Sequence, residues 1–380
     1  MQPEGTLRAD GVHVGGDARQ RFYDSRGYGR PLEGNEIVLT HLEAAHLLFR
    51  GDLSAVSVDG DALGFEPFFV HAAAAVDRFA VRFLVYTDLR DRGFYLSPTR
   101  EGWPGDRRLD GDGEDVDFVV YERGASPPDG ALEHRIRVVG ERESIPVEGL
   151  SGTTLAVVDE ESDLTYFEAV AIDPDGDTRY DPPDDLAGVL LEDRVLAWDV
   201  PGDLYERGFY GRPLSGRAST LEGAIQLSLL EAAFLAERGS LRLDRALPLD
   251  AASSDARTDD DGSVLAPVDA AEAIRERGRA VEGDRFDRRL RVYTDLRDRS
   301  IVPKTGFKFG ADFRTYLEVE TVTDLPHSEH LVRVLEPDHV FVPRELSLDV
   351  RLAGGVRKRM VFAPTGSSSI DYLSVARLTP

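Results

Sequence analysis

The chain has 380 residues and no cysteine, and this absence removes several classes of site at once. Disulfide bridges are excluded, and so are zinc or iron–sulfur centres held by thiolates. No hydrophobic run approaches the length that spans a bilayer. The segment Met1–Gly16 is polar and lacks the apolar centre of a signal peptide. We therefore expect a cytoplasmic protein that is not attached to a membrane.

Lysine is almost as scarce as cysteine. Of the 45 basic residues only three are lysine, and 70 acidic residues bring the formal net charge to −25. Such a surface stays hydrated and soluble when salt screens its charges over short distances. We interpret the composition as adaptation to a saline cytoplasm. It does not exclude an RNA substrate, because high salt weakens phosphate attraction and leaves recognition to local arginine clusters and shape.

The octapeptide Val-Tyr-Thr-Asp-Leu-Arg-Asp-Arg occurs twice, at Val85–Arg92 and Val292–Arg299. An identity of this length indicates an internal duplication. Shorter matches follow the same order in both halves: Tyr28–Leu32 with Tyr210–Leu214, Leu42–Ala45 with Leu230–Ala233, Val116–Tyr121 with Ala311–Tyr316, Arg135–Val139 with Leu331–Leu335, and Leu164–Phe167 with Ile370–Leu373.

The matches divide the chain into a first repeat, residues 1–172, and a second repeat, residues 189–380. Residues 173–188 contain three prolines and many aspartates, so we expect a solvated linker. A further polar break, Arg257–Gly262, divides the second repeat into subdomains at 189–262 and 263–380. The corresponding subdomains of the first repeat are about 1–66 and 67–172.

Periodicity predicts a mixed α/β (α+β) fold in which helices flank a mixed sheet. The expected helices are Leu42–Leu53, His71–Arg92, Leu227–Leu241, Pro267–Arg299 and Pro343–Val356. The expected strands are Phe307–Val322, Leu331–Leu335, Met360–Ala363 and Tyr372–Leu378. The octapeptide would close a helix in each repeat, where we expect packing and salt bridges rather than catalysis.

The two repeats differ in their reactive side chains. His327 stands where the first repeat has Ala131, and Lys358 aligns near Ala156. Alone, a histidine or lysine at a strand is more often structural, but the loss of both from one repeat suggests a shared task in the other. Tyr316 is matched by Tyr121, so the repetition does not separate a catalytic role from packing.

A phenol, an imidazole and an ammonium are the groups that RNA cleavage without a metal requires. A base removes the proton of a ribose 2′-hydroxyl, whose oxygen attacks the adjacent phosphorus. A cation stabilises the charge of the transition state, and an acid protonates the departing 5′-oxygen. A free tyrosine has a pKa of about 10, so its use as a base needs a nearby cation. For the other lysines, Lys304 and Lys308, we expect surface or RNA-backbone contact.

At these residues the chain resembles the archaeal tRNA-splicing endonucleases, closely in the second repeat and more loosely in the first. The resemblance rests on Tyr293–Arg299, Lys304–Tyr316, His327–Ser328 and Arg351–Lys358. It implies Tyr316 as general base, His327 as general acid and Lys358 as the stabilising cation. It also implies cleavage of precursor tRNA at bulge-helix-bulge junctions, with 2′,3′-cyclic phosphate and 5′-hydroxyl ends, and no metal or cofactor.

The resemblance further implies a catalytic subdomain like that of restriction endonucleases, and RNA-binding arginines that sandwich a bulged base. Arg351 fits the first arginine by its motif, and Arg377 is the candidate for the second. In the duplicated type, the inactive repeat inserts an acidic loop into a basic groove of the partner chain. The loop residues Asp159, Glu160, Glu161 and Asp163 are suitably placed, so we expect a homodimer that needs no other protein partner.

Two other functions stay open at this point. Asp312 with Glu318 and Glu320 resembles the carboxylate pattern of a metal-dependent, restriction-like nuclease, although the lysine of that pattern is missing. Alternatively, the chain is a non-catalytic RNA-binding or structural subunit, which would suit the first repeat alone.

Overall fold

The computed structural model describes residues 2–105, 115–125, 130–216, 223–246, 266–366 and 369–380. The chain forms two compact units. The first runs to Val170 and includes Val340–Val350 and Val375–Pro380. The second consists of Ala171–His339 and Arg351–Ser374. The expected break at Arg257–Gly262 lies outside the described residues.

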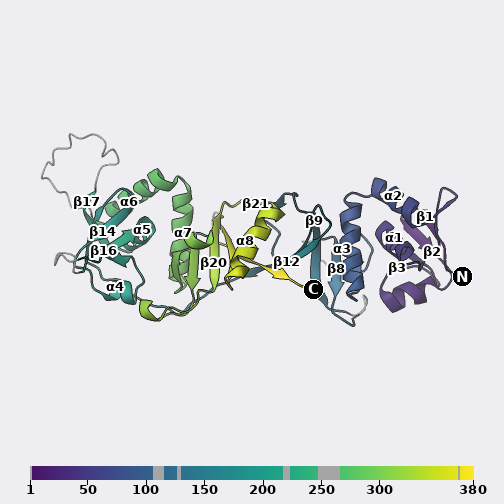
Figure 1. Cartoon of the computed structure of the whole chain (residues 1–380), viewed down its shortest axis with the longest axis horizontal. Helices are drawn as coiled ribbons and strands as arrows, with labels where there is room; N and C mark the ends of the chain where they lie inside the picture. The colour runs from purple at the N-terminus through teal and green to yellow at the C-terminus, as the bar shows by residue number, and fades with distance from the viewer. Residues whose placement is uncertain (1, 106–114, 126–129, 217–222, 247–265, 367–368) are drawn as a thin grey trace. The chain divides into compact units, whose positions relative to one another are not determined.

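The first unit begins with a small sheet in the order β3-β4-β2-β1-β5-β6. Its strands β1, β2 and β3 are labelled in Figure 1. Its strands are β1 (Gly5–Arg8), β2 (Gly11–Val14), β3 (Arg30–Pro31), β4 (Ile37–Leu39), β5 (Val56–Val58) and β6 (Asp61–Leu63). Helix α1 (His41–Phe49) starts at Thr40, whose hydroxyl accepts the amide of Glu43 while the Glu43 carboxylate accepts the amide of Thr40. This capping box fixes where the helix begins.

The rest of the first unit is a helix-covered sheet. Helices α2 (Phe65–Ala75) and α3 (Phe79–Asp91) precede strands in the order β12-β11-β9-β8-β7. These strands are β7 (Leu96–Pro98), β8 (Phe118–Tyr121), β9 (Leu132–Gly140), β11 (Thr153–Val158) and β12 (Leu164–Ile172). Strands β9 and β11 are parallel, and a short strand β10 (Ile145–Pro146) pairs with β21 (Val340–Phe341).

The second unit repeats this order of elements. Its small sheet is β15-β16-β14-β13-β17, with helix α5 (Leu229–Glu237) capped by Ser228 and Glu231. Its strands are β13 (Leu186–Leu190), β14 (Arg194–Ala197), β15 (Arg212–Pro213), β16 (Ile225–Ser228) and β17 (Leu241–Ala246), with a short helix α4 (Asp203–Glu206).

The larger sheet of the second unit has the order β18-β19-β20-β22-β23. It follows helices α6 (Pro267–Glu282) and α7 (Arg285–Asp298), and helix α8 (Pro343–Gly355) connects the parallel strands β20 and β22. The strands are β18 (Val302–Thr305), β19 (Phe313–Tyr316), β20 (His330–Leu335), β22 (Arg359–Pro364) and β23 (Tyr372–Leu378), with 3₁₀ turns η4 (Phe307–Phe309) and η5 (Val322–Asp324).

The duplicated octapeptide ends α3 and α7, as the sequence predicted, and its contacts are structural. The Arg90 guanidinium stacks 3.9 Å from the ring centre of Tyr28 and donates to the carbonyl of Arg26 at 2.7 Å. Arg297 repeats this contact 4.1 Å from the ring centre of Tyr210. Each arginine thus ties the helix end to the Tyr-Gly-Arg-Pro turn of its own repeat.

The aspartate of the octapeptide anchors a later strand. The hydroxyl of Tyr166 on β12 donates to Asp88 at 2.7 Å, and Tyr372 on β23 donates to Asp295 at the same distance. Burial, followed by these carboxylates, raises the pKa of both tyrosines above the ordinary value. The first aspartate and the first arginine of the octapeptide thus have matching partners in both halves.

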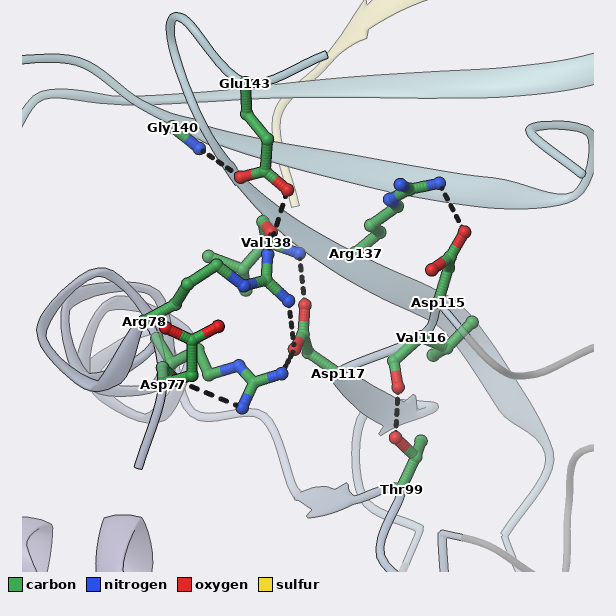
Figure 2. A network of polar contacts seen from close by, with 11 residues as sticks. Asp77, Arg78, Thr99, Asp115, Val116, Asp117, Arg137, Val138, Gly140 and Glu143 are labelled. Carbon is green, nitrogen blue, oxygen red and sulfur yellow. Dashed lines mark hydrogen bonds and ion pairs between the residues drawn. The ribbon is translucent and has the colours of Figure 1, made fainter. Parts of the chain in front are cut away.

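A buried aspartate at the start of a central strand is the second shared anchor. Asp117 accepts from Arg78, Arg82 and the amide of Val138 (Figure 2). Asp312 has the same partners in the second unit: Arg285, Arg289 and the amide of Val334. A carboxylate at 4% exposure, as at Asp312, requires such compensation for its lost hydration.

Several expected elements are shorter than the periodicity predicted. The stretch His71–Arg92 contains two helices, broken before Arg78, whose φ of 52° is left-handed. Pro267–Arg299 is also divided, at Gly283. Phe307–Val322 is a strand only over Phe313–Tyr316, because η4 occupies its beginning. Helix α8 agrees with the predicted helix within one residue.

The segment 173–188 is not a free linker. The amides of Gly176 and Thr178 donate to the carbonyls of Arg299 and Ser300, and Asp177 donates to Leu317. Its last residues, from Leu186, already belong to β13. The aspartates of the segment are exposed, as the composition predicted, whereas Pro174 is buried. The composition did not predict the backbone pairing that holds the segment against the end of α7.

Among the residues that the structure describes, no helix is both long enough and apolar enough to cross a membrane.

A pH-sensitive difference between the repeats can be tested at His46. Burial, followed by the charge of Arg90, lowers the pKa of His46 to about 3, and its Nδ1 lies 3.0 Å from the Tyr28 hydroxyl. A histidine in the unfolded chain has a pKa of about 6.5. Below that value the unfolded state binds a proton that the folded state excludes, so stability falls as the pH decreases from about 6.5 toward 3.

We expect His46→Phe to reduce the loss of stability between pH 7 and pH 5, because Phe234 fills the matching place in the second repeat. Thermal unfolding in molar KCl at both pH values measures the effect. The reverse change, Phe234→His, is the matched control and should add pH sensitivity. Equal pH slopes for His46→Phe and the unchanged chain would contradict this account.

Candidate active site

The strand register brings three segments of the second unit to one edge of its larger sheet. Thr315 of β19 lies opposite His330 of β20, and His330 lies opposite Arg359 of β22. Antiparallel pairing of β19 with β20, and parallel pairing of β20 with β22, therefore puts the end of β19 beside the starts of the other two strands. Tyr316, His327 and Lys358 belong to these three segments.

Lys358 is held at the entrance to β22. Helix α8 ends before it, and Arg357 takes a left-handed φ of 57° that turns the chain into the strand. The ammonium is half-buried and donates to the carbonyl of Ser328 at 2.8 Å. Burial, followed by the charge of Arg314, lowers the pKa of Lys358, and Glu329 acts in the opposite direction. The residue that Lys358 contacts, Ser328, directly follows His327.

Glu329 joins the three segments. Its amide donates to the carbonyl of Thr315 at 3.1 Å, and its own carbonyl accepts the amide of Arg359 at 3.1 Å. Its carboxylate accepts the amide of Leu317 at 3.2 Å. One residue thus fixes the end of β19, the start of β20 and the start of β22. Its place is filled by Glu133 in the first repeat, so it is part of the shared skeleton.

The three candidate side chains differ in exposure. Tyr316 is 3% exposed and packs against Phe209, Val302 and Val319. Lys358 is half-buried, and His327 is exposed in the segment between η5 and β20. The structure places their segments together and gives Lys358 a direct contact beside His327.

The first repeat has the same skeleton and keeps a tyrosine, Tyr121, at the place of Tyr316, but it lacks the other two groups. Ala131 stands in the place of His327, and the counterpart of Lys358 is Ser151 rather than Ala156, which alignment by eye predicted. Matching residue ladders cross the three strands of each repeat: Phe313–Val332–Val361 and Phe118–Ile136–Thr154. Lys358 and Ser151 each lie three residues before the last member of their ladder.

Arg314 is a cation of this site that the sequence analysis missed. It lies two residues before Tyr316, on the same face of β19, with its guanidinium carbon 5.7 Å from the centre of the Tyr316 ring. Its charge also reaches Lys358. The first repeat has Val119 in its place, so the comparison that singled out His327 and Lys358 would have found Arg314 as well.

Lys304 is not an RNA-facing lysine, contrary to the sequence interpretation. Its ammonium donates to the carbonyl of Phe209 at 2.6 Å and to the Glu231 carboxylate at 3.2 Å. Burial alone would raise the pKa of Glu231, but Lys304 and the amides of Ser228 and Gly211 lower it. Lys304 therefore joins the small sheet of the second unit to β18. Lys308 is exposed.

Asp312 is also structural rather than a metal ligand. Its carboxylate oxygens face Arg285, Arg289 and the amide of Val334, and the same arrangement surrounds Asp117 in the first repeat. Glu318 and Glu320, the other acids of the restriction-like pattern, are exposed. Asp312, the first carboxylate of the pattern that suggested a metal-dependent nuclease, is therefore engaged in ion pairs with arginines.

The two candidate RNA-binding arginines are exposed on different elements. Arg351 lies on α8 and belongs to the second unit, whereas Arg377 lies on β23 and belongs to the first.

The acidic segment Asp159–Asp163 forms a defined turn between β11 and β12. The Asp159 carboxylate accepts the amides of Glu161 and Asp163, both at 2.9 Å, and the φ of Ser162 is 68°. Asp159 thus shapes the turn, which leaves Glu160, Glu161 and Asp163 exposed.

A groove of about 490 Å³ in the second unit is lined by parts of α5, α6 and α7 and by Ser369 and Ile370. Its charged lining residues are Arg275, Arg279, Arg291, Glu237, Asp287, Asp295 and Asp298. The first two arginines pair with Glu237 and Asp287, whereas Arg291 donates to the carbonyls of Gly366 and Ser369. The groove is therefore not basic overall, and its positive charge is concentrated at Arg291.

Two family models match parts of the chain. The family described as tRNA intron endonuclease, catalytic C-terminal domain, matches residues 286–372, which include Tyr316, His327 and Lys358. The family described as tRNA intron endonuclease, N-terminal domain, matches twice, at 3–69 and 186–250. This double match agrees with the repeated order of elements.

Relatives that match the chain over nearly its whole length are named tRNA-splicing endonuclease. The chain is 54% identical over 378 residues to the tRNA-splicing endonuclease of Haloferax volcanii, covering 99% of this chain and 100% of the relative. It is 55% identical over 379 residues to that of Halobacterium salinarum, with the same coverage, and 35% identical over 386 residues to that of Methanosarcina mazei, covering 98% of each. The halophilic relatives agree with the interpretation of the acidic composition. The chain belongs to the tRNA-splicing endonucleases, a family of endoribonucleases that act on tRNA introns.

Proposed function

We propose that the second repeat cleaves precursor tRNA at bulge-helix-bulge junctions by metal-free attack of the ribose 2′-hydroxyl on the adjacent phosphorus. The observation that carries the proposal is the 2.8 Å contact of Lys358 with the carbonyl of Ser328, directly after His327. It holds the Lys358 ammonium against the backbone of the residue that follows His327, in segments whose strand register brings them to the end of β19, where Tyr316 lies.

Each group has one step in this reaction. The Tyr316 oxygen takes the proton of the 2′-hydroxyl, and the 2′-oxygen forms a bond to phosphorus. The bond from phosphorus to the 5′-oxygen breaks, and His327 donates a proton to that oxygen. The products are a 2′,3′-cyclic phosphate and a 5′-hydroxyl.

Positive charge from the protein acts on the transition state in this mechanism. The Lys358 ammonium lies next to the developing charge on the phosphate oxygens, and its partial burial strengthens the attraction. Arg314 contributes a second positive charge between Tyr316 and Lys358. Arg351 and Arg377 are our candidates for holding a bulged base between guanidinium planes, by stacking that survives high salt better than long-range attraction.

The first repeat, residues 1–172, serves assembly in this proposal. It keeps the anchors of the fold but has Ala131, Ser151 and Val119 at the places of the reactive groups. Residues 189–380 form the catalytic repeat, with a nuclease subdomain of the restriction-endonuclease type from about residue 263. The enzyme acts in the cytoplasm, without a cofactor, as a homodimer.

The exposed acids of the Asp159–Asp163 turn are the proposed contact between the two chains of the dimer. They would bind the groove of the partner at Arg291, whose charge is offset by carbonyl dipoles rather than by a carboxylate. The first repeat has Leu84 at the matching position, so it has no second such site. Close ion pairs of this kind persist where salt screens longer interactions.

Replacement of the proposed acid tests the mechanism. We expect His327→Ala to slow cleavage of a bulge-helix-bulge RNA in molar KCl by about 10²- to 10⁴-fold, the usual contribution of a general acid. Binding of the same RNA should stay within a few-fold of the unchanged chain, because His327 is exposed and not part of the core. Single-turnover cleavage and fluorescence anisotropy measure the two quantities.

The matched control is His71→Ala, a histidine of α2 in the first unit, which should leave cleavage unchanged. Cleavage by His327→Ala at the normal rate would contradict the proposed role. Loss of both binding and cleavage, with a lower unfolding temperature, would assign His327 to the fold instead.

Charge reversal tests the dimer contact. We expect Glu160→Lys, Glu161→Lys and Asp163→Lys together to convert the dimer to monomer, while Asp159 stays in place to keep the turn. Arg291→Leu, which introduces the residue of the first repeat, should do the same. Light scattering in molar KCl measures the mass. The control reverses Asp181, Asp184 and Asp185, which are exposed acids outside the turn, and should leave a dimer. A dimer in all variants would remove the turn from the interface.

A further inference from the structure

A single aromatic side chain projects beside the candidate site. Phe307 is 87% exposed, the most exposed large hydrophobic side chain in the part of the chain that the structure describes. It belongs to η4, the turn between β18 and β19. One exposed hydrophobic residue needs no explanation in general. Two further observations distinguish this one: the fixed backbone of its turn, and the contact of the same turn with Lys358 through Phe309.

The backbone of η4 is tightly fixed. The amide of Gly306 donates to Asp312, and the carbonyl of Gly306 accepts from Phe309 at 2.8 Å. A β-carbon on Gly306 would lie 2.7 Å from the carbonyl oxygen of Ala311, and Gly310 has a φ of 70°. The two glycines allow the close backbone contacts of this turn. The hydrogen bonds then fix the turn in a conformation that leaves Phe307 exposed.

The turn that carries Phe307 also carries a lysine, and it reaches Lys358 through Phe309. The ring of Phe309, two residues later, has its centre 5.8 Å from the ammonium of Lys358. Lys308, between the two rings, is exposed and is one of three lysines in the chain. The turn thus connects the exposed ring to the cation that we assign to the transition state.

We propose that Phe307 is a stacking platform for an unpaired nucleobase of the RNA, and that Lys308 faces the adjoining phosphate. The proposal rests on the function proposed above and adds a substrate contact to it. An aromatic face next to a cation fits a base and its phosphate, since unpaired bases stack on such side chains irrespective of base identity. Stacking also remains effective in a saline cytoplasm, where attraction between charges is screened. A protein interface would instead require a wider apolar surface around the ring.

Binding to RNA tests the platform in three variants: Phe307→Ala, Phe307→Leu and Phe307→Trp. All are made in a His327→Ala background, so that binding is read without cleavage. Loss of one base stack weakens binding by roughly 5- to 100-fold, so we expect this effect for Phe307→Ala. Phe307→Leu keeps apolar surface without an aromatic face and should resemble Phe307→Ala. Phe307→Trp should bind like the parent.

A spectroscopic measurement locates the base. RNA with 2-aminopurine at one unpaired position of the bulge should lose fluorescence on binding to the parent chain, at the position that stacks. Phe307→Ala should restore that fluorescence. The control is Val268→Ala, a change at a residue of α6 that is 82% exposed, which should alter neither binding nor fluorescence.

The outcomes separate this proposal from the one on which it rests. If the chain with His327 intact cleaves the RNA and Phe307→Ala binds as tightly as the parent, the platform is wrong and the proposed function stands. If Phe307→Ala instead becomes monomeric in light scattering, the ring belongs to a protein interface and the platform is wrong. If the chain with His327 intact neither binds nor cleaves the RNA, both proposals fall.

Discussion

The pairing of β19, β20 and β22 is the constraint on which the candidate site depends. No two of Tyr316, His327 and Lys358 are neighbours in the sequence, and only the register of three strands puts their segments at one edge. Glu329 holds that register with two backbone hydrogen bonds and one carboxylate contact. The ammonium of Lys358 then connects the start of β22 to the segment before β20, because it donates to the carbonyl of Ser328. A shift of β22 by one residue would turn Lys358 to the other face of the sheet.

Both repeats keep the polar anchors of this fold and a tyrosine at the place of Tyr316, but only the second has the candidate histidine and lysine. Asp117 and Asp312 each compensate two arginines, and Arg90 and Arg297 each tie a helix end to a tyrosine turn. These contacts are partly or fully buried, so the loss of one partner would leave a charge without compensation. That penalty explains why both repeats keep the anchors. The positions of His327, Lys358 and Arg314 carry no such penalty, and in the first repeat they are alanine, serine and valine.

Much of this arrangement could be predicted from the sequence. The duplication predicted that both copies of the octapeptide end a helix, and the comparison of His327 with Ala131 indicated the candidate edge of the sheet. Contacts between segments far apart in the sequence could not be predicted. Lys304 was assigned to the surface because its partners, Phe209 and Glu231, are distant in the chain. Ser151 could not be identified as the counterpart of Lys358, because the sequence does not contain the strand register that aligns the two residues. Arg314 could not be singled out by residue type, because most of the 45 basic residues of the chain are arginine.

The central claim is that side chains of the second repeat activate a ribose 2′-hydroxyl against its own phosphodiester. Replacement of that hydroxyl by hydrogen at the scissile nucleotide tests it most directly, in molar KCl with excess chelator. The account predicts that the chain cleaves the all-ribose RNA under these conditions. It also predicts that the chain binds the 2′-deoxy RNA equally well and leaves it intact. Cleavage of the 2′-deoxy RNA at a normal rate, or loss of all cleavage with chelator, would contradict the account.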